Sequence, residues 1–271
     1  GQYWGHMNLR ERVDRFFIAQ FEGLSLDQAD EMDILEANGS VNFGSNKAYR
    51  AMLKKIKAGS PATNPDDLQY ILDNVDVDNL FEYMALEMFV GNSDIGNIRY
   101  YRLHQEGSKW KWIWYDADYG LYSSKFNSPW SYLKVKGMGE QKIDNTIFLK
   151  LLEHPDYKRK FLEKLADVYK TFTTEYMTQV LDGVVAEIQP EMKNHWERWG
   201  ELNDKAVTSE VPTTIDGAYT YWESRVNRLY NTLKVRPHRL WDFIKDEFKL
   251  TKAEMEELFG PQPDYPDDAV L

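Results

Sequence analysis

Residues 91–120 read GNSDIGNIRYYRLHQEGSKWKWIWYDADYG, and the rest of this chain is organised around them. Residues 98–104 and 109–115 are rich in branched and aromatic side chains, and the polar sequence QEGS separates them. Two such runs joined by a short turn that contains glycine predict an antiparallel β-hairpin.

Polar side chains stand at both ends of this predicted hairpin. Asp94 and Asn97 precede the first strand, and Asp116 and Asp118 follow the second. Antiparallel pairing brings the start of one strand beside the end of the other, so these residues can converge on one small volume. Three carboxylates repel one another unless a cation lies between them. Oxygen ligands of this kind suit Mg²⁺, with phosphates in the remaining positions.

A purely structural interpretation of the same residues stays open. Asp and Asn beside Gly are ordinary turn residues, and each position taken alone fits that role. The Asp-x-Asp pattern at the end of an apolar strand favours a ligand site, because burying Tyr115 beside two carboxylates is costly without a ligand.

An apolar helix is predicted immediately before the hairpin, ending at Gly91. Asp76 or Asp78 can cap its amino terminus. Its apolar side chains recur at helical spacing at Val77, Leu80, Phe81, Met84, Met88 and Phe89. This stripe indicates a buried core helix rather than a cofactor site, and a rigid helix would fix where Asp94 points.

Composition argues against several classes of protein. The formal net charge of −11 is wrong for a nucleic-acid partner, which requires a basic patch. The absence of cysteine excludes a disulfide scaffold and thiolate metal sites. No window approaches the roughly 18 consecutive apolar residues of a membrane span. The five histidines show no H-E-x-x-H spacing.

The rest of the pattern predicts an α+β fold that is mostly helical. Residues 3–13 alternate as in a strand, Asp14 can cap a helix to about Phe21, and a short strand pair is expected near residues 33–43. The other predicted helices span residues 46–57, 66–72, 146–152, 156–169, 174–199 with a break at Pro190, 215–233, 240–248 and 252–259.

The hairpin region contains, in order, Asn-x-Asp, Asn, an aromatic strand and Lys-Trp-x-Trp-Ile-x-Tyr-Asp-x-Asp. This order resembles the spore coat protein H (CotH) kinase family. Residues 3–14 and 33–39 also look like that family, and the resemblance runs to about Phe259. It implies one kinase-like domain over residues 1–259, corresponding to the carboxy-terminal lobe of an atypical protein kinase. Most of the amino-terminal lobe is expected to be missing, and residues 260–271 are expected to form a disordered acidic, proline-containing tail.

The resemblance implies that the γ-phosphate of ATP is transferred to Ser or Thr of a coat or envelope protein, with Mg²⁺ or Mn²⁺. Asp94 resembles the catalytic base, while Asn97, Asp116 and Asp118 resemble metal ligands. Asp116 is favoured for the main metal because it follows the strand directly. The long segment 120–139 is expected to control substrate access. Trp130 and Tyr132 there would either form an acceptor surface or pack onto the core.

The strand expected over residues 3–13 resembles the hinge between kinase lobes, whose backbone would face an adenine ring. An ordinary edge strand is the alternative. The residues that the resemblance assigns to nucleotide binding are Asn8, Leu9, Arg10 and Glu11.

Two departures from the kinase pattern keep a second function open. Asp94 and Asn97 are three residues apart, whereas the kinase catalytic loop spaces this pair about five apart. A turn shortened in this way could draw Asn97 off the metal, in which case Asn92 or another group would substitute for it. No Gly-rich loop or strand lysine precedes residue 3. The alternative is a catalytically impaired, kinase-like structural or binding protein of the cell envelope, which the nine Trp and seventeen Tyr would allow to bind carbohydrate. Either protein is expected to be bacterial and extracytoplasmic.

We expect this fragment alone to be inactive and to bind Mg²⁺-ATP weakly or not at all. The strand lysine and Gly-rich loop would supply charge-assisted hydrogen bonds to the phosphates, which are the stronger class. Calorimetry with Mg²⁺-ATP tests this, and a dissociation constant in the low micromolar range, about −8 kcal/mol, would contradict it.

Overall fold

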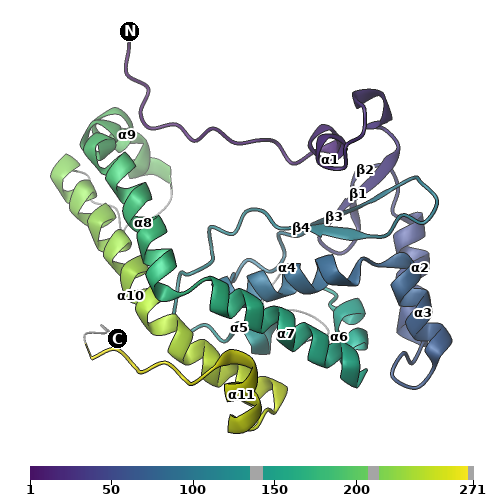
Figure 1. The fold of residues 1–271 in the computed structure, drawn as a ribbon. Helices are drawn as coiled ribbons and strands as arrows, with labels where there is room; N and C mark the ends of the chain where they lie inside the picture. Colours follow the sequence, from purple (N-terminus) through teal and green to yellow (C-terminus); the bar gives the residue numbers. More distant parts are fainter. Residues whose placement is uncertain (135–142, 207–213, 268–271) are drawn as a thin grey trace. The chain divides into compact units, whose positions relative to one another are not determined.

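The computed structural model describes residues 1–134, 143–206 and 214–267. Its one described sheet is antiparallel with the strand order β2-β1-β3-β4. The strands are β1 (Met32–Glu36), β2 (Ser40–Phe43), β3 (Arg99–Leu103) and β4 (Lys111–Ile113), and helices make up most of the rest (Figure 1). The predicted α+β class, the central hairpin and the short strand pair near residues 33–43 are confirmed.

The helices agree closely with the sequence periodicity. Asp14 and Asp76 cap α1 and α4 through their side chains, as predicted, and Pro190 separates α8 from α9. The helices and 3₁₀ turns are α1 (Arg15–Phe21), η1 (Leu26–Gln28), α2 (Lys47–Ala58), α3 (Pro65–Asn74), α4 (Val77–Val90), α5 (Ser128–Tyr132), α6 (Thr146–Leu152), α7 (Pro155–Thr171), α8 (Thr174–Ile188), η2 (Gln189–Glu191), α9 (Met192–Ala206), α10 (Ile215–Phe248) and α11 (Lys252–Phe259).

The chain forms two compact units. The first contains residues 1–10, 172–237 and 264–271, and the second contains residues 11–171 and 238–263. The second unit holds the sheet and every residue of the predicted catalytic and metal site.

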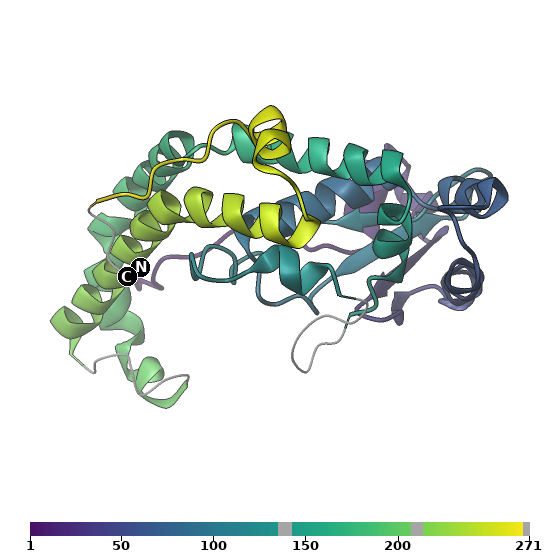
Figure 2. The same cartoon turned by 90° about the horizontal axis from the view of Figure 1, so that it is seen from below.

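Helix α4 forms the centre of the second unit, between β4 and α7 (Figure 1). Its Phe81 packs edge-on against Phe161 of α7, with ring centroids 5.4 Å apart. Phe148 of α6 joins the same cluster at 4.8 Å from Phe161. Figure 2 shows α7 and α4 from below. Three fully buried aromatic rings give α4 a rigid setting, as its apolar stripe predicted.

The outer edge of β4 is covered by the chain that leads into α4. The Trp110 N–H donates to the Asn74 carbonyl at 2.8 Å, and the Asp76 N–H donates to the Trp110 carbonyl at 3.0 Å. The Asn79 side chain then bonds both the N–H and the carbonyl of Trp112, at 2.6 and 3.0 Å. These bonds satisfy an edge that would otherwise be open to pairing with another chain, and they attach the hairpin to α4.

The strand predicted over residues 3–13 is wrong, since residues 1–13 form neither helix nor strand. Alternation yields a strand only where another strand takes up its backbone hydrogen bonds, and no described strand does so. The segment packs on α9 within the first unit instead. Gly5 has φ +89, and a Cβ there would lie 2.3 Å from Nε1 of Trp199. That indole donates to the Trp4 carbonyl at 2.9 Å.

The separate helices predicted over residues 215–233 and 240–248 are one helix, α10, which contains Pro237. Proline removes a helical hydrogen bond and usually kinks or ends a helix. Leu233 and Val235 before it, and Leu240 and Trp241 after it, are buried. Burial of these side chains offsets the lost bond, which the local sequence does not reveal.

The carboxy-terminal tail begins with a segment that is attached to α10. The Gly260 carbonyl accepts a hydrogen bond from the Trp241 indole at 3.1 Å, and the Pro263 carbonyl lies 2.7 Å from Nδ1 of His238. Residues 268–271 of the tail expected to be disordered lie outside the described residues.

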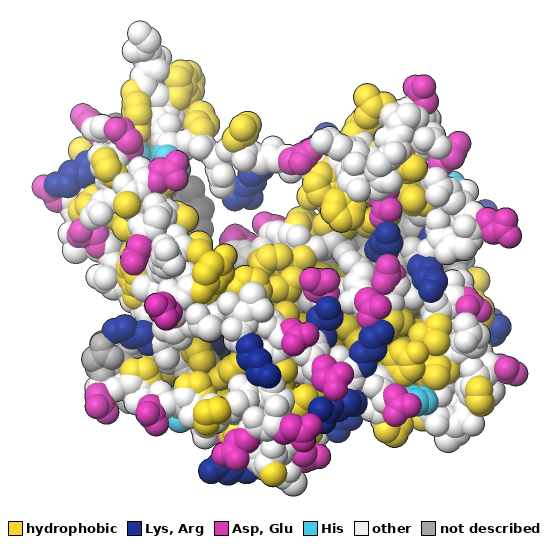
Figure 3. Space-filling model, in the orientation of Figure 1, with side chains coloured by type: hydrophobic (Ala, Val, Ile, Leu, Met, Phe, Trp, Pro, Cys, Tyr) yellow, Lys and Arg dark blue, Asp and Glu magenta, His cyan; other side chains and the backbone are white. Residues whose placement is uncertain are grey.

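On the face shown in Figure 3, acidic and basic side chains are interspersed. Among the described helices, none combines the length and the apolar character needed to cross a membrane.

We predict that the ion pair between Lys57 and Asp144 stabilises the second unit in a pH-dependent way. Partial burial opposes ionisation, but hydrogen bonds from Lys57 and Thr146 lower the pKa of Asp144 below its usual 3.8. Lys57 is half-exposed, so screening limits the pair to about 1 kcal/mol or less.

The Asp144→Asn variant should therefore lose up to about 1 kcal/mol of unfolding free energy at pH 7. A carboxyl group whose pKa is lower in the folded state than in the unfolded state stabilises the fold at pH values above its pKa in the unfolded state. That contribution disappears as the pH falls through the pKa of the folded state. Urea denaturation from pH 7 to pH 2.5 measures this difference. A difference that stays constant over that range would contradict the prediction.

Candidate active site

The end of α4 turns the chain directly into the predicted site. Gly91 closes the helix in the left-handed conformation, with φ 66 and ψ 47, and its N–H donates to the Glu87 carbonyl. The Asn92 side chain then accepts a hydrogen bond from the Asp94 N–H at 3.0 Å. The Asn97 N–H donates to the Asp94 carbonyl at 3.2 Å. These two bonds define the turn between α4 and β3 and fix the backbone of Asp94.

The two ends of the hairpin meet as predicted at Asn97 and Asp116. Nδ2 of Asn97 donates a hydrogen bond to Oδ2 of Asp116. Oδ1 of Asn97 accepts a hydrogen bond from the Tyr115 hydroxyl at 2.7 Å. The amide is thus held at both ends, by Asp116 and by Tyr115, which both lie beyond the end of β4.

Asp94 acts on the same group of side chains. Burial is the first cause that raises the pKa of Tyr115, and the negative charges of Glu36, Asp116 and Asp94 raise it further against the opposing charge of Arg99. The Tyr115 phenol thus responds to Asp94 and to Asp116. No hydrogen bond joins the side chains of Asp94 and Asp116 within the described residues, and the convergence of Asp94 with Asn97 and Asp116 remains a prediction.

Asp116 has an unusual backbone conformation, with φ 55. Left-handed backbone is uncommon for residues other than glycine, although Asp and Asn adopt it more readily than most. Leu121 also has a positive φ of 57, and its N–H donates to the Val90 carbonyl at 2.6 Å. Strained residues of this kind concentrate at functional sites and persist only where the surroundings hold them.

Asp118 lies in the turn between these two strained residues and is exposed. The Gly120 N–H closes that turn on the Ala117 carbonyl at 2.8 Å. Within the described part of the chain, no hydrogen bond or ion pair joins Asp118 to Asn97 or Asp116. Its assignment as a second metal ligand remains a prediction.

The four residues predicted to bind nucleotide are exposed and lie outside regular secondary structure. Asn8, Leu9 and Arg10 belong to the first unit and Glu11 to the second. The strand that motivated their assignment is absent, and the assignment itself remains a prediction.

One contact attaches the chain just after Glu11 to the site. The Arg99 guanidinium donates to the Val13 carbonyl, pairs with Glu36 at 3.2 Å and lies 5.0 Å from the Tyr115 ring centroid. Arg99 therefore connects the start of the second unit to the tyrosine that binds Asn97.

The donor chemistry at Asn97 and Asp116 fits a hard divalent cation. Asp116 is exposed and has a further carboxylate oxygen, while Oδ1 of Asn97 keeps a second lone pair beside its bond from Tyr115. Oxygen donors with open positions for phosphate are typical of Mg²⁺ sites. The described residues contain no group of three or more His, Cys, Asp or Glu side chains arranged to hold a metal.

Sequence reasoning missed the buried polar side chains behind this turn. Glu87 and Asn92 are 2% and 1% exposed, and Tyr132 is buried against both. Tyr132 therefore packs onto the core, whereas Trp130 is exposed. The available signal was Glu87 itself, a charged residue three positions after Met84 on the apolar stripe of α4.

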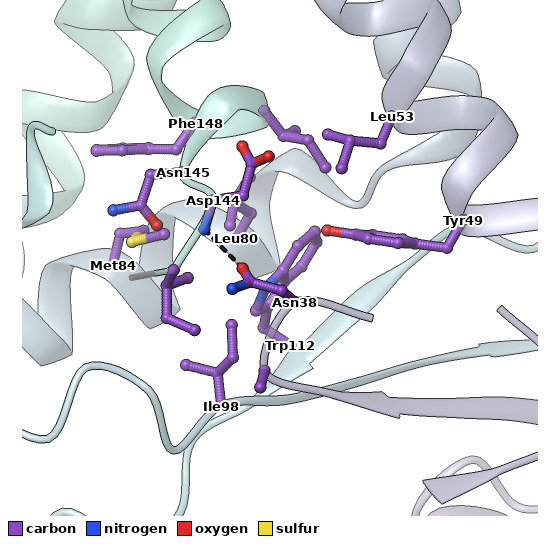
Figure 4. Close-up of a pocket in the computed structure, with 13 residues that line it drawn as sticks. Asn38, Tyr49, Leu53, Leu80, Met84, Ile98, Trp112, Asp144, Asn145 and Phe148 are labelled. Atoms are coloured by element: carbon purple, nitrogen blue, oxygen red, sulfur yellow. Dashed lines mark hydrogen bonds between the residues drawn. The ribbon is translucent and has the colours of Figure 1, made fainter. Parts of the chain in front are cut away.

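A cavity of about 320 Å³ in the second unit is lined by other residues. Figure 4 shows its walls of Tyr49, Met84 and Trp112, and the Asn38 side chain that accepts a hydrogen bond from the Asp144 N–H at 2.9 Å. A concave apolar site with few polar groups suits a small molecule. None of the predicted site residues lines it, and no sequence motif indicated it because its residues come from separate segments.

We predict that the left-handed backbone at residue 116 makes an alanine variant less stable than a glycine variant. Asp116→Gly and Asp116→Ala both remove the carboxylate, but alanine at φ 55 carries a cost of about 1 kcal/mol that glycine avoids. Denaturation should therefore find the glycine variant more stable. Residue 118 has no positive φ, so the Gly and Ala variants there are the control and should rank in the opposite order. The same order at both positions would contradict the prediction.

The sequence matches the protein family described as CotH kinase protein over residues 1–240. Comparisons with curated proteins and with solved structures found no match. The matched range contains the turn with Asp94, the hairpin and Asp116. The chain therefore belongs to the CotH kinase protein family.

Proposed function

We propose that this protein, in the form that its gene encodes, is an atypical protein kinase of the CotH type, which transfers the γ-phosphate of ATP to a Ser or Thr hydroxyl of a coat or envelope protein. The observation that carries the proposal is the hydrogen bond between Asn97 and Asp116. It puts an amide and a carboxylate from opposite ends of the hairpin in contact, next to the turn that holds Asp94. Phosphoryl transfer needs mainly such positioned polar groups and little covalent chemistry from the protein.

Asp94 is the proposed catalytic base. It would orient the acceptor hydroxyl and take its proton as the oxygen bonds to the γ-phosphorus, while the bond to the β-phosphate oxygen breaks and ADP leaves. Asp94 is only partly buried, so an acceptor can approach it. Its N–H is fixed by Asn92, so its backbone is already ordered before an acceptor binds.

Asn97 and Asp116 are the proposed ligands of Mg²⁺ or Mn²⁺, with Asp118 as a possible second carboxylate. A divalent cation there neutralises charge on the phosphates. The strained backbone of Asp116 and its bond to Asn97 favour it over Asp118. The order Asp118-Tyr119-Gly120, however, also follows the aspartate–aromatic–glycine order of the kinase metal motif.

Nucleotide contact by the backbone of Asn8, Leu9, Arg10 and Glu11 belongs to the same proposal. The contact of Arg99 with the Val13 carbonyl supports it for Glu11, because it holds the neighbouring backbone near Tyr115. We further propose one kinase-like domain over residues 1–259, resembling a carboxy-terminal lobe, in a bacterial protein of the cell envelope or the secreted fraction. The family match to residue 240 supports the domain.

Substitution of the base or of the metal ligand should abolish transfer while the fold survives. In the protein as its gene encodes it, Asp94→Asn and Asp116→Gly should each lower phosphate transfer to a Ser-rich acceptor by roughly 10²-fold or more. Transfer is measured with γ-labelled ATP and Mg²⁺ or Mn²⁺. Glu106→Gln is the matched control, because Glu106 is an exposed carboxylate at the far turn of the hairpin.

The outcomes separate the proposed roles. Full activity of a folded Asp94→Asn or Asp116→Gly variant would overturn the role of that residue. Asp118→Ala decides between the two aspartates, because the main ligand should show the larger loss. An unsubstituted protein that transfers no phosphate but binds a cell-envelope partner or a glycan would favour the non-catalytic alternative.

A further inference from the structure

The cavity of about 320 Å³ in the second unit has walls that are joined by hydrogen bonds. One wall is the turn of Ala37 and Asn38, between β1 and β2. The Ala37 N–H donates to the Ile98 carbonyl at 3.1 Å, and the Asn38 side chain accepts from the Asp144 N–H at 2.9 Å. All four residues line the cavity. Its shape is therefore fixed in advance, which lowers the cost of ordering the walls around a ligand.

The rest of the lining is mainly apolar and suits a flat, aromatic ligand. Tyr49, Trp112 and Phe148 supply rings from α2, β4 and α6, and the Met84 thioether comes from α4 (Figure 4). Aromatic rings and methionine sulfur both pack favourably against a further ring. A cavity of about 150 Å³ admits benzene, so a cavity about twice as large has room for a fused-ring molecule.

One buried polar atom faces this cavity without a partner. Asn145 is 5% exposed, and its Nδ2 donates to the Tyr132 carbonyl at 3.0 Å. A carbonyl only accepts hydrogen bonds, so the NH₂ group must face Tyr132, which leaves Oδ1 to face away from it. Figure 4 shows this Oδ1 on the side of Asp144 and Asn38. In the part of the chain that the structure describes, no group donates a hydrogen bond to it.

The lining favours a ligand that is neutral and carries a donor. The Asp144 carboxylate at the edge of the cavity is already paired with Lys57. A charged ligand would lose its water shell among apolar walls without a new opposite charge. The Oδ1 of Asn145 is an acceptor, and a buried acceptor that meets no donor costs free energy. A matching ligand therefore presents an N–H or O–H group at this point.

We infer that this cavity binds a neutral, fused-ring aromatic molecule whose N–H or O–H group donates a hydrogen bond to Oδ1 of Asn145. Indole has the required size and a single donor, and it serves as the probe. The inference is independent of the proposed function, because Asp94, Asn97 and Asp116 do not line the cavity and each test below measures binding alone.

The first test compares indole with benzofuran, which has nearly the same shape but an oxygen in place of the N–H. Calorimetry or NMR titration is carried out with the protein as its gene encodes it. We expect indole to bind with a dissociation constant of about 1 mM or lower. Benzofuran should bind at least about tenfold more weakly, because it leaves Oδ1 of Asn145 without a donor. Undetectable binding of indole, or equal affinity for both molecules, would overturn the inference.

Methionine methyl groups locate the bound probe. Met84 lines the cavity, whereas Met255 of α11 is equally well buried and does not. In protein labelled at the methionine methyl groups, saturating indole should shift the Met84 resonance and leave the Met255 resonance unchanged. Saturable binding that leaves Met84 unchanged would place the probe elsewhere and contradict the inference.

The Asn145→Leu variant tests the polar contact. Leucine has nearly the same shape as asparagine but no polar atom. Loss of the bond to Tyr132 should lower stability, but the ratio of the two affinities within one variant is insensitive to that loss. We expect both molecules to bind this variant and the preference for indole to disappear. A preference that stays at about tenfold would overturn the role of Asn145.

The Leu53→Trp variant tests the cavity itself. Leu53 of α2 lines the cavity and is only partly buried, so a larger side chain can occupy the space with little overpacking. Both molecules should bind this variant at least about tenfold more weakly. Lys54→Trp is the matched control, because Lys54 is the next residue, is exposed and does not line the cavity. Its affinities should be unchanged.

The remaining outcomes also decide the inference. Unchanged indole binding by a folded Leu53→Trp variant would overturn it. If that variant does not fold, Leu53→Phe replaces it, since phenylalanine adds less volume, and the same loss of affinity is expected. If Asn145→Leu does not fold, the comparison of indole with benzofuran in the unsubstituted protein decides whether a donor is recognised.

Discussion

The pairing of β3 with β4 on the surface of α4 is the constraint on which the candidate site depends. Asn97 and Asp116 are nineteen positions apart in the chain, and antiparallel pairing alone brings them together. The hairpin would be marginal as two strands in water. It is stabilised by β1 on one side and, on the other, by the Asn79 side chain, which bonds the backbone of Trp112. Helix α4 thus takes the place of a fifth strand.

Helix α4 also determines where the chain leaves its carboxyl end. Aromatic packing of Phe81 holds the helix, Gly91 ends it in a conformation that suits glycine, and Asn92 shapes the turn that follows. The polar site therefore depends on the apolar stripe, because a helix that could rotate or slide would move Asp94. Glu87 is the exception to the stripe, and the Tyr132 hydroxyl contacts both Glu87 and the Asn92 carbonyl.

Membership of the CotH kinase family and the local geometry support the same function by separate routes. The family match rests on the sequence of residues 1–240, whereas the contact between Asn97 and Asp116 rests on strand pairing. The three-residue spacing of Asp94 and Asn97 still permits the amide to reach Asp116, so the short turn does not remove Asn97 from the site. The Tyr115 hydroxyl donates a hydrogen bond to the Asn97 side chain and so restrains the amide.

The fold class, the hairpin, most helices and the contact of Asn97 with Asp116 could be predicted from the sequence, because periodicity, capping residues and the pairing within a hairpin follow local rules. The sequence could not determine whether residues 3–13 find a strand partner, or whether α10 continues through Pro237, because both depend on what packs against them. The left-handed backbone of Asp116 and the hydrogen bond from Tyr132 to the buried Glu87 likewise depend on tertiary contacts. Their partners come from distant segments, and no spacing in the sequence encodes such a meeting.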